Sequence, residues 1–289
     1  MIFKSFAGKT FLQWRKKMIS QGGRKNDFDW LLDIAAGVSW SKLQSIILNP
    51  EHFVSLKIST EELEVIWESH LKDQTPLQYL ISKSPWRDFE LEVSEDALIP
   101  RQETEFLIDL ALQKVENLKL GRWADLGTGS GPLAISLARS LPNWNGHAVD
   151  ISQNALKLAG RNLKSHVSNS NVELSLGNWW EPLERWWGSF DLVLSNPPYI
   201  PSDLIKDLEP VVKNHEPFIA LDGGDDGMVA SKQIIIGASY GLAKGGWLIL
   251  EHHYDQSEKI IELMENIGMK EVSFEKDLNG TKRYAICRK

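Results

Sequence analysis

The sequence contains little cysteine, and this excludes several kinds of site. Cys287 is the one cysteine among 289 residues, so an internal disulfide and a cysteine-rich zinc site are both excluded, and we expect no bound metal. The stretch from Arg283 to Cys287 has the alternation of a strand. This pattern predicts a buried strand thiol in preference to a reactive nucleophile.

Long hydrophobic runs and an excess of positive charge are also missing. Lys4, Lys9 and Arg15 interrupt the first residues, and no apolar core with a cleavage site follows, so we expect no signal peptide. The most apolar later stretch, residues 234–250, is cut by several glycines and by Lys244, which argues against a membrane span. The net charge of −7 argues against stable binding of nucleic acid, because phosphate binding needs a basic face. We expect a cytoplasmic, monomeric enzyme.

Residues 1–85 have the apolar spacing of a small helical domain. Apolar side chains recur on one helical face in residues 11–19 and again in residues 28–35. Ser59 and Glu62 have the spacing of a capping box at the start of a further helix. This portion has no cluster of histidines or carboxylates that could do chemistry. We expect it to recognise a partner, and a purely stabilising extension is the alternative.

Residues 86–100 change to the pattern of strands. Residues 89–93 alternate between apolar and charged side chains, and residues 94–96 have the composition of a turn. We expect a β-hairpin that turns at residues 94–96. It would link the helical domain to a larger domain formed by residues 101–289.

A glycine-rich loop between a short apolar strand and a helix indicates a nucleoside-binding site. The strand at residues 123–126 continues into Gly127-Thr128-Gly129-Ser130-Gly131, and Pro132 begins the helix. Glycines let a ligand approach the backbone, and the start of a helix offers free N–H groups. The spacing G-x-G-x-G differs from the G-x-G-x-x-G fingerprint of dinucleotide sites. It therefore favours a nucleoside cofactor without a pyrophosphate, namely S-adenosylmethionine.

Two further strand ends supply candidate cofactor contacts. Asp150 ends a strand about 20 positions after the loop, where an acidic side chain can bind ribose hydroxyls. The alternative is a carboxylate that caps the helix near Ser152. A third strand, residues 172–176, ends shortly before Asn178 and Trp179. We expect these two residues to contact adenine, with a place in the core as the alternative.

A double proline follows the apolar strand at residues 190–194, in the segment Ser195-Asn196-Pro197-Pro198-Tyr199. Neither proline can donate a backbone hydrogen bond, so the ladder ends here and the chain stays stiff. The carboxyl end of such a strand is where open α/β sheets bind their ligands. The Asn196 side chain and the Pro197 carbonyl could accept both N–H bonds of a planar NH2 group. Tyr199 adds an aromatic wall; a turn without function is the alternative.

Together the motifs resemble the release-factor glutamine methyltransferases (the HemK or PrmC family). The resemblance runs over nearly the whole chain and is carried by Pro76-Leu77-Gln78-Tyr79-Leu80, Leu98-Ile99-Pro100-Arg101-Gln102-Glu103-Thr104-Glu105, and residues 125–131, 195–201, 215–217, 220–227 and 276–280. The Asn-Pro-Pro-Tyr motif is shared with adenine-N6 and guanine-N2 methyltransferases, so it indicates only an amino acceptor. The Ile-Pro-Arg segment and the helical N-terminal domain are what select this family.

The resemblance implies a fold, an activity and a site. The fold is a Rossmann-like class I S-adenosylmethionine-dependent methyltransferase, an α/β protein with a doubly wound seven-stranded sheet whose last strand is antiparallel. The activity is methyl transfer to the side-chain amide nitrogen (N5) of the glutamine in the GGQ motif of peptide chain release factors. Alternative acceptors are a ribosomal-protein glutamine or a base of nucleic acid, and a non-catalytic binding protein is the third possibility.

The residues of the double-proline segment then divide into roles. Asn196, Pro197, Pro198 and Tyr199 would bind the substrate, and Asn196, Pro197 and Tyr199 would act in catalysis. Asn196 would also contact the cofactor, together with the glycine loop, Asp150 and the tip of the third strand. The motif has no Asp or Glu, so no strong general base is expected before methyl transfer.

Overall fold

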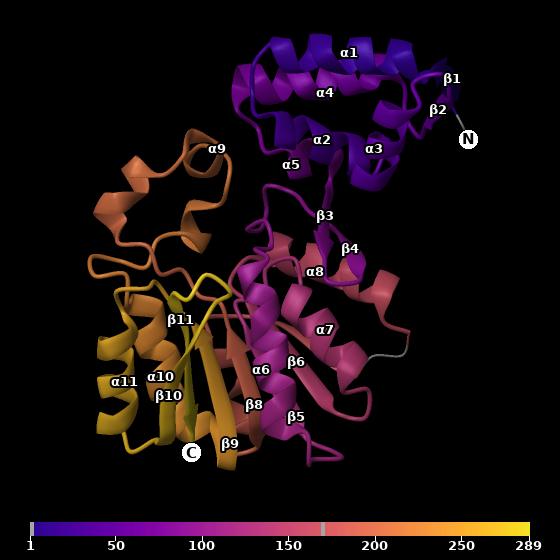
Figure 1. Ribbon diagram of the computed structural model, residues 1–289. Coiled ribbons are helices and arrows are strands. Elements are labelled where there is room, and N and C mark those ends of the chain that lie inside the picture. Colours follow the sequence, from indigo (N-terminus) through magenta and orange to yellow (C-terminus); the bar gives the residue numbers. More distant parts are fainter. Residues whose placement is uncertain (1–2, 169–170) are drawn as a thin grey trace. The chain divides into compact units, whose positions relative to one another are not determined.

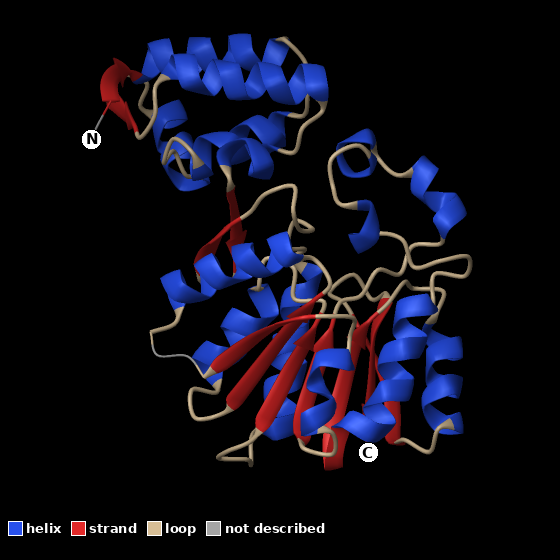
Figure 2. Ribbon diagram, turned by 180° about the vertical axis from the view of Figure 1, so that it is seen from behind, coloured by secondary structure: helices blue, strands red, loops and turns tan. Residues whose placement is uncertain are grey.

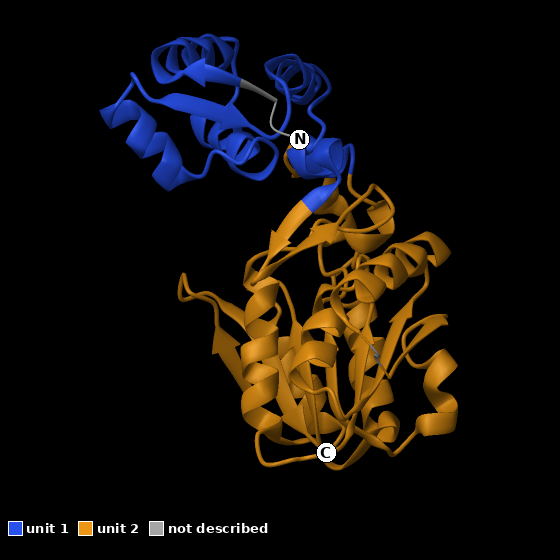
Figure 3. Cartoon of the chain, turned by 90° about the vertical axis from the view of Figure 1, so that its right-hand side faces the viewer, with its two compact units in different colours: residues 1–83, 210–215 blue, residues 84–209, 216–289 orange. Residues whose placement is uncertain are grey.

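The computed structural model describes residues 3–168 and 171–289 of the chain. The chain divides into two compact units, which Figure 3 colours separately. Unit 1 comprises Met1–Lys83 and Pro210–His215, and unit 2 comprises Ser84–Glu209 and Glu216–Lys289. Each has a hydrophobic core of its own.

Unit 1 is mostly helical, as its apolar spacing predicts. Its helices are α1 (Gly8–Ser20), α2 (Lys25–Ile34), α3 (Trp40–Leu48), α4 (Thr60–Asp73), α5 (Leu77–Ile81) and the short α9 (Pro210–Lys213). The capping box is confirmed at the start of α4: the Ser59 side chain accepts a hydrogen bond from the Glu62 N–H, and the Glu62 carboxylate accepts one from the Ser59 N–H. These bonds satisfy two N–H groups that the first helical turn leaves free.

A small antiparallel sheet of β1 (Phe3–Ala7) and β2 (Phe53–Leu56) is also part of unit 1. The sequence pattern does not predict it. Strands of four and five residues are too short to establish an alternation, and Phe53 is exposed although it is apolar.

Unit 2 begins with a hairpin whose turn the sequence pattern places wrongly. The hairpin consists of β3 (Lys83–Trp86) and β4 (Phe89–Glu92), so it turns at Arg87 and Asp88 and not at residues 94–96. Arg87 has a φ of 49°, the left-handed conformation that tight hairpin turns require. The polar residues 94–96 form a separate loop, in which the Ser94 side chain accepts a hydrogen bond from the Asp96 N–H.

The large sheet of unit 2 confirms the predicted fold class. Its seven strands are β5 (Arg122–Leu126), β6 (Asn145–Asp150), β7 (Val172–Leu176), β8 (Phe190–Ser195), β9 (Leu242–Glu251), β10 (Lys270–Lys276) and β11 (Lys282–Arg288). They lie in the order β10-β11-β9-β8-β5-β6-β7, and β11 is antiparallel to both of its neighbours. The pairs from β9 to β7 are parallel.

Helices cover both faces of this sheet (Figures 1 and 2). They are α6 (Phe106–Val115), α7 (Pro132–Ser140), α8 (Gln153–His166), α10 (Val229–Gly241) and α11 (Ser257–Asn266). Successive strands run outward from β5 through β6 to β7, and the chain then returns to β8 on the other side of β5. Open α/β sheets bind ligands at such a reversal of strand order, outside the carboxyl ends of the strands.

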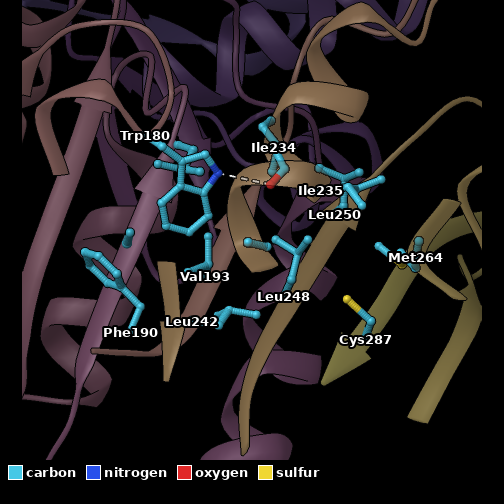
Figure 4. Close-up of a cluster of buried hydrophobic side chains, with 14 of the residues drawn as sticks. Trp180, Phe190, Val193, Ile234, Ile235, Leu242, Leu248, Leu250, Met264 and Cys287 are labelled. Carbon is cyan, nitrogen blue, oxygen red and sulfur yellow. Dashed lines mark hydrogen bonds between the residues drawn. The ribbon is translucent and has the colours of Figure 1, made fainter. Parts of the chain in front are cut away.

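The core of unit 2 includes Trp180, which lies among apolar side chains from β8, β9 and α10 (Figure 4). Its indole Nε1–H donates a hydrogen bond of 3.0 Å to the Ile234 carbonyl. Cys287 is in the same cluster and is fully buried, as its strand pattern predicts. In the part of the chain that the structure describes, no helix has the length and apolar character needed to cross a membrane.

Candidate active site

A cavity of about 400 Å³ lies at the carboxyl ends of the parallel strands, within unit 2. The loops after β5, β6, β7 and β8 line it, together with residues 96–104 and 217–224 and the start of α10. Its volume is that of a site for a small organic ligand. Of the residues predicted from sequence, those that line it are Gly127, Thr128, Gly129, Ser130, Asp150, Asn178, Trp179, Asn196 and Pro198. Gly131, Pro197 and Tyr199 do not line it.

The glycine loop is fixed to the neighbouring strand by its own backbone. The N–H groups of Gly127 and Thr128 both donate to the Val149 carbonyl at 2.9 Å. Gly127 has a φ of 79°, and a Cβ there would lie 3.1 Å from the ring of Trp179. A side chain at this position would therefore be strained and would press on the cavity wall. Gly131, which does not line the cavity, is the N-cap residue of α7 and has a φ of 90°.

Asp150 both lines the cavity and organises the loop. Its Oδ2 accepts a hydrogen bond of 2.8 Å from the Gly129 N–H, and its Oδ1 accepts one of 2.8 Å from the Ser152 N–H. Burial raises the pKa of this carboxyl, while the backbone N–H groups oppose that rise. The helix that follows is capped by the Ser152 side chain, which accepts from the Ala155 N–H. Asp150 therefore remains available to a ligand in the cavity.

Trp179 forms part of the wall in a strained backbone conformation. Its φ of 47° is in the left-handed region, which a bulky residue adopts rarely. Such strain is often found at ligand sites, where the surrounding structure holds it in place. The neighbouring Asn178 also lines the cavity, and its N–H donates to the Glu181 carboxylate at 3.2 Å.

The double-proline segment leaves β8 at the edge of the cavity. The Ser195 hydroxyl donates to the Leu126 carbonyl at 2.6 Å, which joins the end of β8 to the end of β5. Asn196 Nδ2 donates to Thr104 Oγ1 at 2.9 Å. Pro197 is buried, and Pro198 reaches the cavity.

Tyr199 does not line the cavity, and its side chain is hydrogen-bonded at the end of β9. Its hydroxyl donates to Glu251 Oε1 at 3.3 Å, and its carbonyl accepts from Gln256 Nε2 at 2.9 Å. Burial and the Glu251 carboxylate raise the pKa of the Tyr199 hydroxyl well above its usual range. The phenol therefore stays protonated as a hydrogen-bond donor.

An ion pair that the sequence pattern does not predict joins two segments of the cavity wall. Arg101 Nη2 lies 2.6 Å from Glu216 Oε1, and Glu216 Oε2 accepts a hydrogen bond of 3.2 Å from the Ile99 N–H. Glu216 is nearly inaccessible to solvent, so both of its oxygens need these donors. The pair fixes the residues around Pro100 against those around Pro217, and both segments line the cavity.

The cavity fits the nucleoside cofactor that the sequence indicates. Ser130 Oγ is buried and has no hydrogen-bond partner among residues 3–168 and 171–289, although Ser130 lines the cavity. A buried hydroxyl without a partner indicates a missing polar ligand or water. Asp150, residues of the glycine loop and Trp179 also line the cavity, so a carboxylate, backbone groups and an aromatic ring are present there, and groups of these kinds can bind a nucleoside. Within the same described residues, no group of three or more His, Cys, Asp or Glu could hold a metal ion.

Comparisons with known proteins agree with this geometry. The family model of the methyltransferase small domain matches residues 102–209. The chain is 56% identical over 284 residues to the release factor glutamine methyltransferase of Prochlorococcus marinus, and the match covers 98% of this chain and 97% of that protein. It is 34% identical over 295 residues to the protein of the same description from Synechocystis sp., again covering 98% and 97%.

The fold itself also has a relative of known structure. The catalytic domain of hMettl16, crystallised in complex with a MAT2A 3'UTR hairpin, superposes with a TM-score of 0.58 at 14% identity, over 94% of this chain and 91% of that one. At this identity the likeness shows the methyltransferase fold alone. The two curated relatives cover nearly all of both chains at 56% and 34% identity, which confirms the resemblance carried by the motifs. The chain belongs to the release factor glutamine methyltransferase family.

Proposed function

We propose that this chain transfers the methyl group of S-adenosylmethionine to the side-chain amide nitrogen (N5) of the glutamine in the GGQ motif of peptide chain release factors. The observation that carries the proposal is the double-proline corner, which brings Asn196 to the wall of the cavity with its amide nitrogen already bonded to Thr104. The amide oxygen of Asn196 is therefore left to accept a hydrogen bond from a substrate. An acceptor held in this way suits a carboxamide or amino group.

The cofactor's neighbours in this proposal are the residues that line the cavity. The glycine loop, Asp150 and the segment of Asn178 and Trp179 would hold the nucleoside. S-adenosylmethionine, when bound, supplies a methyl carbon attached to a positively charged sulfur.

The chemical difficulty lies in the acceptor nitrogen, because the lone pair of an amide is delocalised into its carbonyl. The motif predicts the Asn196 side chain and the Pro197 carbonyl as acceptors of its two N–H bonds, although of these two residues only Asn196 lines the cavity. A hydrogen bond accepted from the nitrogen strengthens as positive charge develops there. This stabilisation is directed at the transition state. Correct placement of the nitrogen adds a proximity effect that reaches about 7–11 kcal/mol in the best-oriented systems. The proton can leave after the transfer, when its pKa has fallen, so no strong base is needed first.

Unit 1 has no part in the cavity, since every residue that lines the cavity belongs to unit 2. We assign the helical N-terminal domain, predicted as residues 1–85, to recognition of the release factor; its residues 1–83 belong to unit 1. The chain would act as a monomer in the cytoplasm, where translation ends.

The proposal is tested by mapping the product. Purified release factor is incubated with the enzyme and S-adenosylmethionine, and in parallel reactions a ribosomal protein, DNA and rRNA are offered in the same buffer. Mass spectrometry should find one added methyl group on the glutamine of the GGQ motif. A release factor in which this glutamine is replaced by glutamate is the matched control and should gain none. Methylation of nucleic acid in preference to the release factor would contradict the proposal.

A further inference from the structure

Four residues from three separate segments of the sequence form one chain of hydrogen bonds that begins at the cavity wall. Asn196 Nδ2 donates to Thr104 Oγ1 at 2.9 Å, and Thr104 Oγ1 donates to Glu251 Oε2 at 2.8 Å. The other carboxylate oxygen of Glu251 accepts from the Tyr199 hydroxyl at 3.3 Å. Asn196 and Tyr199 follow β8, Thr104 belongs to the short helix η1 (Glu103–Glu105), and Glu251 ends β9. Thr104 is 4% exposed and Glu251 is 1% exposed, so water cannot readily replace these contacts.

The chain of bonds has a direction, and the carboxylate sets it. An ionised carboxylate only accepts hydrogen bonds, so the single hydroxyl proton of Thr104 must point to Glu251. The Thr104 oxygen is then left with lone pairs alone. It can accept from the NH2 group of Asn196 but cannot donate to its carbonyl oxygen. The NH2 side of the amide is therefore turned toward Thr104 and the oxygen toward the cavity.

We propose that Thr104 and Glu251 are positioning residues, which through this chain hold the Asn196 amide oxygen toward the acceptor nitrogen of the substrate. The proposal rests on the role given above to Asn196. Without the carboxylate, the Thr104 hydroxyl is free to donate to the Asn196 oxygen. The amide would then turn its NH2 group toward the substrate. That group would face the N–H bonds of the substrate nitrogen and could not accept a hydrogen bond from them. Thr104 and Glu251 thus determine whether the Asn196 side chain presents its oxygen or its NH2 group to the substrate.

The surroundings of Glu251 make this device sensitive to pH. Its carboxylate interacts with titratable and charged groups from the loop after β8, from β11 and from η1, namely Tyr199, Arg283, Tyr284 and Glu103. Burial is the largest influence and raises the pKa of Glu251 to about 7, against the hydrogen bonds and Arg283, which lower it. Above this pH both carboxylate oxygens of Glu251 accept hydrogen bonds. As the pH falls through about 7, one oxygen of Glu251 takes up a proton. The carboxyl group then no longer requires the Thr104 hydroxyl to donate to it.

The first test replaces Thr104 with residues of similar size. Thr104→Val keeps the shape and removes the hydroxyl, whereas Thr104→Ser keeps the hydroxyl and removes a methyl group. Thr104→Val should lower kcat about tenfold or more, since the Asn196 NH2 group loses its partner, while Thr104→Ser should stay within about threefold of the wild type. The Kd of S-adenosylmethionine, measured by calorimetry, should change less than about threefold in both.

A second readout does not depend on turnover. The side-chain NH2 resonances of Asn196, identified by their loss in Asn196→Ala, should shift in Thr104→Val and keep their wild-type positions in Thr104→Ser. Thermal unfolding of both variants shows whether the fold is intact. Equal kcat values and equal spectra for the two folded variants would overturn the proposal.

The third test concerns Glu251. The wild-type kcat should fall about tenfold between pH 8 and pH 6, because the carboxylate becomes protonated over this range. Glu251→Gln cannot titrate, so its kcat should be nearly constant over the same range, whatever its level at pH 8. A wild-type pH profile in this variant would refute the role of Glu251.

These outcomes are separate from a failure of the proposed function. If the chain does not methylate release factors, the wild-type enzyme itself will show no product. If only the positioning role is wrong, the wild type will be active and Thr104→Val will be equally active.

Discussion

Asn196 offers an acceptor and a donor on one short side chain, and the proposed chemistry uses the acceptor at the substrate and the donor at Thr104. Asn196→Ala removes both. We expect its kcat to fall by about 10²–10³, the usual cost of losing one hydrogen-bonding group directed at a transition state. The Kd of S-adenosylmethionine should stay within about tenfold, because the glycine loop and Asp150 are unchanged.

Steady-state kinetics and calorimetry measure the two quantities. Asn145→Ala is a suitable control, since Asn145 is exposed at the opposite end of β6. Near-normal turnover in Asn196→Ala would refute the role of this side chain.

Asp125 is a buried carboxyl directly before the glycine loop, and it makes the stability of the protein depend on pH. It is fully inaccessible to solvent, and the Thr128 hydroxyl donates to its Oδ2 at 2.7 Å. Burial raises the pKa of Asp125 to about 7, although the bond from Thr128 opposes the rise. The folded state therefore holds a proton that the unfolded chain has released above about pH 4. This contribution to the unfolding free energy is complete below that pH and is lost as the pH rises to about 7.

In the variant Asp125→Asn, this fall in the free energy of unfolding between pH 4 and pH 7 should be absent. The wild type should lose up to about 4 kcal/mol relative to the variant between pH 4 and pH 7, since each pKa unit corresponds to about 1.4 kcal/mol. Urea unfolding at several pH values measures it. Asp226→Asn is the control: Lys232 lowers the pKa of the exposed Asp226, so this variant should run parallel to the wild type above pH 5. If the free energy of unfolding of Asp125→Asn changed with pH in parallel with that of the wild type, the expectation would be wrong.

At the level of elements, α10 contains two glycines that the helix itself would not favour. Gly237 and Gly241 lie one turn apart, and a Cβ on either would come within 2.1 or 2.2 Å of the Trp180 ring. The indole cannot easily move, because its N–H is bonded to Ile234 of the same helix (Figure 4). These glycines let the helix approach a buried tryptophan in the core of unit 2.

Gly237→Ala should therefore destabilise the protein although alanine is the better helix former. Alanine gains about 1 kcal/mol of helix propensity, but forcing atoms into a packed core costs about 1–3 kcal/mol and more where backbone must shift. We expect a net loss of about 1–2 kcal/mol in urea unfolding. The same change at Gly160 of α8 meets only the end of the flexible Leu174 side chain, at 3.2 Å. Gly160→Ala should therefore leave the free energy of unfolding unchanged or raise it. Equal changes in Gly160→Ala and Gly237→Ala would contradict the packing argument.

The sequence predicts the elements that are long or strongly patterned. The parallel strands and the helices α1, α2 and α4 follow from apolar spacing, and the glycine loop and the capping box at Ser59 follow from residue types at fixed positions. The shorter helices α3 and α5 are not predicted. The small sheet of β1 and β2 could not be predicted, because strands of four and five residues have no measurable period. The turn at Arg87 could not be predicted either, because it uses a residue that rarely adopts a positive φ.

The site is predictable only in part for a different reason. Residues that follow directly on a strand or a loop, such as Asp150 and Asn196, are identified by their place in the motif. Thr104 is 92 positions from Asn196 and 147 positions from Glu251. Nothing in one sequence says which distant carboxylate meets which hydroxyl, so this network becomes visible only when β8, β9 and η1 are brought together.

On the scale of the whole molecule, each of the two units has a hydrophobic core, and the cavity lies in unit 2. The core of unit 1 packs around Phe28 and Trp67, and that of unit 2 around β8 and β9. Every residue that lines the cavity belongs to unit 2. Binding to the folded state alone stabilises it by an amount that grows with ligand concentration, about 2.7 kcal/mol at one hundred times the Kd.

Saturation with S-adenosylmethionine should therefore slow hydrogen exchange in unit 2 and leave unit 1 nearly unchanged. We expect added protection in the glycine loop, β5 and β6, whose amides open only when unit 2 opens, and no added protection in α1 and α2. Exchange measured by mass spectrometry with and without the ligand gives both values in one experiment. Asp150→Ala is the control, because it removes a carboxylate that lines the cavity and that we propose binds the cofactor. This variant should lose the added protection at the same ligand concentration. Equal protection of α1 and α2 in the wild type would mean that the two cores unfold in one step, and the stability changes predicted above would then describe the whole chain and not unit 2 alone.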